Sequence, residues 1–299
     1  MIEKERRKLN TFQVWLLAAR PRTLPAAASP VLVGIALAVA GGRFRFGPAL
    51  AALLAALLLQ VGANIANDVF DFHRGADTSA RQGPLRVTQA GLLAPGQVLA
   101  GMWVTFALAG MLGLYLTLVA GWPILLVGIA SITAAILYTG GPLPFGYYGL
   151  GDLFVFIFFG PVAVCGTYYV QAGQLTPAAA WASIPIGLLT TAILVVNNLR
   201  DIETDRSAGK MTLAVRLGAS GARLEYLLCV GGAYLVPLLM WVLGIASGWV
   251  MLSWLSLPLL LPLVRMIYRE VGKPLNRALA GTGQFELVYA ILFSIGLIL

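Results

Sequence analysis

Nine long apolar segments dominate this chain and restrict what it can fold into. They fall at about residues 24–40, 48–68, 95–119, 123–138, 150–171, 177–198, 222–243, 248–264 and 280–299. About 20 apolar residues are enough for a helix to cross the hydrocarbon core of a bilayer. Only 11% of the residues are charged, against about a quarter in a soluble domain. We therefore predict an all-α integral membrane protein with nine transmembrane helices, forming a single domain over residues 1–299.

The basic residues are distributed unequally between the two sides that nine spans would define. If the N-terminus is cytoplasmic, 18 of the 20 Lys and Arg residues fall on the inner side, and only Arg43 and Arg45 fall outside. The positive-inside rule therefore predicts a cytoplasmic N-terminus. This orientation accounts for the net charge of +8, and we expect no nucleic-acid partner.

Two groups of polar residues end the second and the sixth apolar segments. In the first group, Asn64, Asn67, Asp68 and Asp71 are spaced by three or four residues, with Asp77 following. In the second group, Asn197, Asp201 and Asp205 are spaced by four residues. Each set shares one face for as long as its helix continues. Four spans separate the two groups, so both emerge on the same side of the membrane.

Acidic side chains that converge near a bilayer repel one another and are costly to desolvate. A divalent cation relieves both costs, and carboxylate and amide oxygens suit Mg²⁺, which commonly bridges to phosphate. Basic residues flank both groups and indicate a substrate with a polyanionic head; they are Arg74, Arg81, Arg86, Arg206 and Lys210. The natural partner of such a head at a membrane is a long apolar tail.

With these motifs the chain resembles the UbiA superfamily of intramembrane prenyltransferases. Its two Asp-rich motifs are approximated by Asn67-x3-Asp71 and Asp201-x3-Asp205. Four segments are similar to the group that prenylates 1,4-dihydroxy-2-naphthoate, namely residues 19–26, 86–93, 146–152 and 197–218. The first motif departs from the family pattern, because Gly75 stands where a third acid is common and Asp77 is the nearest substitute.

The resemblance implies transfer of a polyprenyl chain from polyprenyl diphosphate to 1,4-dihydroxy-2-naphthoate, with release of diphosphate and carbon dioxide. This is a step of menaquinone biosynthesis, expected in the bacterial inner membrane with the active site facing the cytoplasm. It further implies two Mg²⁺ ions, with Mn²⁺ as an alternative, held by Asp71, Asp201 and Asp205 with Asp68 and Asp77 as helpers. Lys210 and the neighbouring Arg residues would stabilise the leaving diphosphate.

Further residues are candidates for binding the substrates. Arg22 or Arg20 would hold the carboxylate of the acceptor. Asn64, Asn67 and Asn197 would orient substrate or metal-bound water, and Tyr138 would either face the allylic cation or anchor the helix at the membrane interface. The acceptor could instead be 4-hydroxybenzoate, a chlorophyllide or haem. A transporter of metal or a polyanion is the alternative outside the enzymes, and the oligomeric state stays open.

Overall fold

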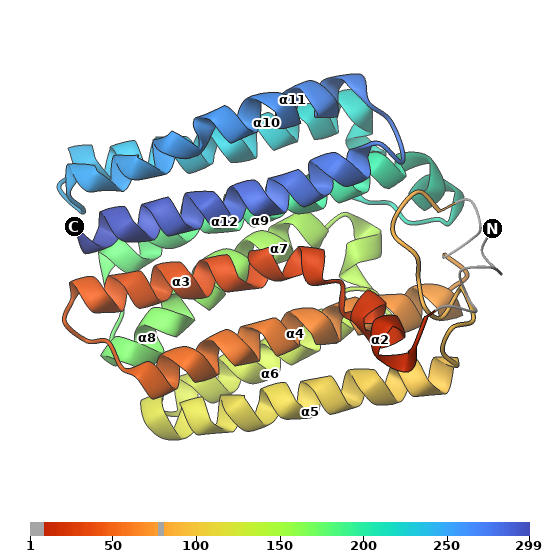
Figure 1. The fold of residues 1–299 in the computed structure, drawn as a ribbon, viewed down its shortest axis with the longest axis horizontal. Coiled ribbons are helices and arrows are strands. Elements are labelled where there is room, and N and C mark those ends of the chain that lie inside the picture. Colours follow the sequence, from red (N-terminus) through yellow and green to blue (C-terminus); the bar gives the residue numbers. More distant parts are fainter. Residues whose placement is uncertain (1–8, 77–80) are drawn as a thin grey trace.

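The structure is a computed structural model and describes residues 9–76 and 81–299. Every regular element in these residues is helical, and Figure 1 shows the long helices running side by side. In chain order the α-helices are α2 (Thr11–Ala19), α3 (Leu24–Ala40), α4 (Phe46–His73), α5 (Pro95–Ala120), α6 (Trp122–Leu137), α7 (Gly151–Ile157), α8 (Gly166–Ala172), α9 (Pro177–Ser207), α10 (Leu213–Val242), α11 (Leu257–Arg269) and α12 (Leu275–Ile298). A π-helix over Phe158–Cys165 joins α7 to α8, and a 3₁₀-helix over Gly248–Ser256 leads into α11.

The predicted membrane architecture is confirmed. In the described part of the chain, eight helical segments are long and apolar enough to cross a membrane. The 16-residue α6 is a further, shorter apolar helix. Together these elements coincide with the nine apolar segments of the sequence. Figure 1 shows α2 and the ends of α4 and α9 at one end of the bundle, with the C-terminus at the other.

Three boundaries differ from the sequence-based expectation. α4 continues to His73 and α9 to Ser207, each past the end of its apolar segment. Asn64, Asn67, Asp68 and Asp71 of the first group and the three residues of the second are therefore all helical. α10 begins at Leu213 and is kinked at Gly218, where φ is 71°. The short helix α2 precedes the first span, and a reciprocal pair of hydrogen bonds between Asn10 and Gln13 caps its start.

The fifth span passes very close to α9. A Cβ added to Gly160 of the π-helix would lie 3.0 Å from the Cα of Gly187 and 2.9 Å from the Ser183 carbonyl oxygen. Small residues allow such close approach of helices inside a membrane. The opposite side of the π-helix, which carries Phe158 and Val162, is left to line a cavity.

Three hydrophobic clusters hold the described part of the bundle together. The largest lies mainly between α9, α10 and α12, a second lies between α2, α4 and α5, and a third lies among α3, α4, α5, α6 and α8. Within the largest cluster, Glu286 of α12 is fully buried, and its Oε1 accepts a hydrogen bond of 2.6 Å from the Thr190 hydroxyl of α9. This hydrogen bond links α9 to α12 inside the packed core.

Candidate active site

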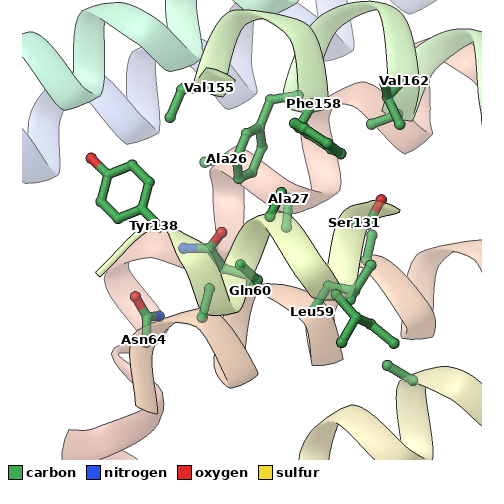
Figure 2. A pocket seen from close by; sticks show the side chains of 18 of the residues that line it. Ala26, Ala27, Leu59, Gln60, Asn64, Ser131, Tyr138, Val155, Phe158 and Val162 are labelled. Atoms are coloured by element: carbon green, nitrogen blue, oxygen red, sulfur yellow. The ribbon is translucent and has the colours of Figure 1, made fainter. Parts of the chain in front are cut away.

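A cavity of about 700 Å³ lies among α3, α4, α5, α6, the π-helix and α9. One part is polar and is lined from α4, the loop after it and α9, whereas the rest is lined largely by small and apolar residues. Figure 2 shows Phe158 and Val162 on one side of it and Gln60 and Asn64 on the other. The size falls within the range of roughly 300–1,000 Å³ that is typical of ligand sites.

Three residues of the first motif line the cavity, but Asp68 does not. Asn64, Asn67 and Asp71 all face it. At roughly 100° per residue, Asp68 lies at the edge of this face. Its two carboxylate oxygens instead accept hydrogen bonds from the backbone N–H groups of Val87 and Thr88, at 3.1 and 3.0 Å.

Asp68 thus fixes the segment that carries Arg86, and it is 1% exposed. Hydrogen bonds from two backbone N–H groups satisfy a buried carboxylate well. Asp68 therefore holds this segment in place, and its role as a helper to the metal stays a prediction. The other predicted helper, Asp77, lies outside the described residues. Gly75 has a φ of 68° and directly follows the C-cap residue of α4, which is a conformation that favours glycine over an acid.

The second motif lines the cavity as its spacing predicts. Asn197, Asp201 and Asp205 all face it from α9. The helix ends through Gly209, where φ is 71°, and the Lys210 N–H donates to the Asp205 carbonyl at 2.8 Å. This turn brings the Lys210 ammonium to 3.9 Å from Oδ1 of Asp205, inside the same cavity.

Each of the three cavity-lining carboxylates has its own cationic partner. Arg86 donates to Asp71 at 2.9 Å. Arg200 donates to Asp201 at 3.0 and 2.5 Å, and Lys210 is the partner of Asp205. No group of three acidic, His or Cys side chains comes together in the described part of the chain as a ready metal cage. Each of these carboxylates therefore has a separate cation beside it.

This donor set fits Mg²⁺ bound together with a diphosphate. Mg²⁺ is usually held by one or two protein carboxylates, with substrate phosphates and water completing its coordination, and seldom by an all-protein cage. Asp71 comes from one helix, and Asp201 and Asp205 come from another. Arg81, Arg86 and Lys210 line the same part of the cavity and can contact phosphate oxygens.

Two further residues organise the motifs, and neither was among the expected site residues. Arg200 is 3% exposed and also donates to Asn197 and to Asn276, each at 2.8 Å. It thereby ties α9 to the start of α12. Tyr147 donates its hydroxyl to Asp71 at 2.8 Å, and the Lys210 ammonium lies 5.3 Å from the centre of its ring. Tyr147 belongs to a segment that the family resemblance highlights, which is the one sequence signal for it.

The remaining predicted residues divide between cavity and surface. Tyr138 lines the cavity, and burial, followed by the nearby Asp152, raises the pKa of its phenol above the ordinary value, so the group stays neutral. Arg22 is exposed and does not line the cavity. Arg74 donates instead to the carbonyl oxygens of Thr139, at 3.0 Å, and Gly141.

Arg206 also lies outside the cavity. It pairs at 3.4 Å with Glu203, and both side chains are more than half exposed. The asparagines that do line the cavity have structural partners as well. Asn67 accepts the Thr139 hydroxyl at 2.9 Å, and Asn197 accepts from Arg200. Expectations for Arg22, Arg74 and Arg206 as substrate ligands therefore find no support in this arrangement.

Comparison of sequences places this geometry in a family. The pattern of the UbiA prenyltransferase family matches residues 27–280. The 1,4-dihydroxy-2-naphthoate octaprenyltransferase of Escherichia coli (strain K12) is 40% identical over 299 residues, covering 98% of this chain and 97% of that protein. The enzymes of the same name from Mycobacterium tuberculosis (strain ATCC 25618 / H37Rv) and Bacillus subtilis (strain 168) are 40% and 32% identical, and each covers more than 90% of both chains.

Comparison of structures finds the same fold. The apo structure of a UbiA homolog from Aeropyrum pernix K1 superimposes with a TM-score of 0.68 at 14% identity, covering 91% of this chain and 96% of that one. A UbiA homolog from Archaeoglobus fulgidus, solved bound to DMAPP and Mg²⁺, gives a TM-score of 0.63 at 15% identity, covering 95% and 98%. With the family match over residues 27–280 and the relatives at 32–40% identity, the chain belongs to the UbiA prenyltransferase family.

Proposed function

We propose that this protein transfers a polyprenyl group from polyprenyl diphosphate to 1,4-dihydroxy-2-naphthoate. The C–O bond between the prenyl carbon and the diphosphate breaks, a C–C bond to the ring forms, and the ring loses its carboxylate as CO₂. The products are demethylmenaquinol, CO₂ and diphosphate, and the overall exchange needs no added proton or oxidant. Bacterial relatives at 40% identity over nearly the whole chain carry the name of this activity.

The observation that carries the proposal is the division of one cavity into two chemically different parts. Acids from both motifs and four cations line the polar part, and small or apolar residues line most of the rest. A diphosphate head with an apolar tail matches this division. A charged solute in transit would instead need polar groups along the whole path.

The residues at the polar part have distinct roles in the reaction. Asp71, Asp201 and Asp205 would hold Mg²⁺, which supplies positive charge to the leaving diphosphate. Arg81, Arg86 and Lys210 bind the diphosphate oxygens and stabilise the charge that develops on them. The apolar walls exclude water from the allylic carbon. The neutral Tyr138 ring presents its π-face to positive charge that develops there.

The distribution of basic residues supports a location in a bacterial inner membrane with the polar part of the cavity facing the cytoplasm. Purified protein in detergent, given a polyprenyl diphosphate and the naphthoate labelled at its carboxylate, should release labelled CO₂ together with a lipid-soluble product. Chelation of divalent metal should abolish both, and added Mg²⁺ should restore them. Asp71→Asn and Asp201→Asn should each lower kcat by about 10²–10³-fold, as loss of a group that stabilises transition-state charge does.

Turnover that survives chelation, or full activity in both Asn variants, would refute the proposal. The acceptor is tested separately by a panel containing 4-hydroxybenzoate, a chlorophyllide and haem. A higher kcat/KM for any of these than for the naphthoate would overturn the assignment of the acceptor and leave the prenyltransferase reaction standing.

A further inference from the structure

Arg20 has an unusual backbone conformation at the turn between α2 and α3. Its φ is 51°, and in the described part of the chain it is the one residue other than glycine with a positive φ. A branched or long side chain in the left-handed region costs free energy and persists only where the surroundings impose it. The position of the Arg20 side chain is therefore imposed by its neighbours.

Two amides of α4 hold this turn. Asn64 donates its Nδ2 to the carbonyl of Ala19 at 3.0 Å and to the Thr23 hydroxyl at 2.9 Å. Gln60 donates to the same hydroxyl at 3.2 Å. Both amides also line the cavity, where Figure 2 shows them side by side on α4. These hydrogen bonds hold the backbone on both sides of Arg20, and the Arg20 side chain lines the cavity.

The Arg20 guanidinium has no anion of its own in the described residues. It lines the cavity, and its Nη2 is buried without a hydrogen-bond partner there. The nearest acidic charges are Asp68 and Asp71. Asp68 is occupied by two backbone N–H groups, and Asp71 by Arg86 and Tyr147. A buried guanidinium nitrogen without a partner is costly, so an anion from outside should complete this site.

The surroundings of Arg20 favour a planar carboxylate over the diphosphate. Arg20 comes from the α2–α3 turn, whereas the cations assigned to the diphosphate come from the loop after α4 (Arg81 and Arg86) and from the turn after α9 (Lys210). On the cavity wall Arg20 is followed by Thr23 and then by Ala26 and Ala27. These alanines and Phe158, all labelled in Figure 2, line the cavity together and give it a small-residue and aromatic wall suited to an aromatic ring. The flat guanidinium fork matches a carboxylate in a two-point contact.

We propose that Arg20 binds the carboxylate of the aromatic acceptor and so determines that the acceptor is an aryl carboxylate. This inference rests on the proposed function. It selects between the two arginines that the sequence leaves open, because Arg22 is exposed and lies outside the cavity lining. A diphosphate could also pair with Arg20, so the experiment must separate the two anions.

The test compares Arg20→Gln and Arg20→Lys with Arg22→Gln in steady-state assays. Arg20→Gln should raise the KM for the naphthoate by about 10- to 100-fold, the range expected for a lost hydrogen bond to a charged group. The KM for polyprenyl diphosphate should stay within about threefold of the wild-type value. Arg20→Lys should lie between wild type and Arg20→Gln, because it keeps the charge but loses the fork. The preference for the naphthoate over 1,4-dihydroxynaphthalene, which lacks the carboxylate, should collapse in Arg20→Gln.

A direct binding measurement completes the test. Titration of 1-hydroxy-2-naphthoate, which carries the carboxylate, should show weaker binding to Arg20→Gln, whereas diphosphate with Mg²⁺ should bind unchanged. The inference is overturned if diphosphate binding weakens and naphthoate binding does not, or if Arg22→Gln reproduces the loss. A wild-type protein that prenylates no aryl carboxylate refutes the proposed function itself, which is a distinguishable result. Thermal unfolding of each variant identifies a loss of fold.

Discussion

Arg200 is the buried cation whose removal should disturb the site most. It makes two contacts with Asp201 and further hydrogen bonds to Asn197 and Asn276. Arg200→Gln would leave the Asp201 carboxylate, only 5% exposed, without this counter-ion. Removing one partner of a buried ion pair costs about 3–5 kcal/mol of the free energy of unfolding. Asn276→Ala removes one of the four contacts, together with the hydrogen bonds that its amide donates to the Gln82 and Lys273 carbonyls, and should cost about 1.5–3 kcal/mol.

A double-mutant cycle measures this pair directly. The free energy of unfolding is obtained for wild type, Arg200→Gln, Asp201→Asn and the double variant by SDS titration in mixed micelles, followed by tryptophan fluorescence. The double variant leaves no uncompensated charge. Its loss of unfolding free energy should therefore be smaller than the sum of the two single losses by about 2 kcal/mol or more. Losses that add within about 0.5 kcal/mol would refute the energetic coupling of Arg200 with Asp201.

Three other changes test the remaining parts of the site. Asp68→Asn should lower the free energy of unfolding by about 1.5–3 kcal/mol, measured by the same titration, because its amide nitrogen faces a backbone N–H; no loss would contradict its anchoring role. Tyr147→Phe removes the hydroxyl that contacts Asp71 and should lower kcat/KM about fivefold, whereas wild-type kinetics would show that the contact is unimportant. Gly128→Leu fills the apolar part of the cavity, where an added Cβ meets open space, and should lower kcat/KM for long prenyl diphosphates about tenfold relative to short ones. Gly231→Leu, on an exposed position of α10 that also faces open space, is its control, and equal losses in both would contradict a tail path along α6.

The helices were predictable because apolar length is a local property of the chain. Each apolar segment of about 20 residues has few alternatives to a membrane-spanning helix. The ends of the two motif helices were harder to predict. Their last turns carry Asn and Asp side chains, which water and tertiary contacts stabilise equally well. The extension of α4 to His73 and of α9 to Ser207 depends on partners elsewhere in the fold. Hydropathy alone therefore ends each helix too early.

The site was predictable only as far as helical periodicity reaches. Periodicity places Asn197, Asp201 and Asp205 on one face of α9, and they line the cavity together. Periodicity could not predict that the Asp68 carboxylate, at the edge of the corresponding face of α4, accepts a hydrogen bond from a backbone N–H 19 residues away. Nor could periodicity predict the hydrogen bond between Arg200 and Asn276, which are 76 residues apart in the sequence. These contacts depend on which helices become neighbours.

The separate pairing of the three acids changes the physical case for the metal. The sequence suggests that motif acids converge and repel, so that a divalent ion is needed to hold them. In the structure each carboxylate already has a cation, through Arg86, Arg200 or Lys210. The cations therefore offset part of the repulsion, and Asp71 and Asp201 still act on Asp205. A metal–diphosphate complex brings its own positive and negative charges, so it can exchange partners with these pairs without leaving a buried charge unbalanced. On this argument the diphosphate and Mg²⁺ should bind tightly only together, and diphosphate without metal should bind at least tenfold more weakly in a direct titration.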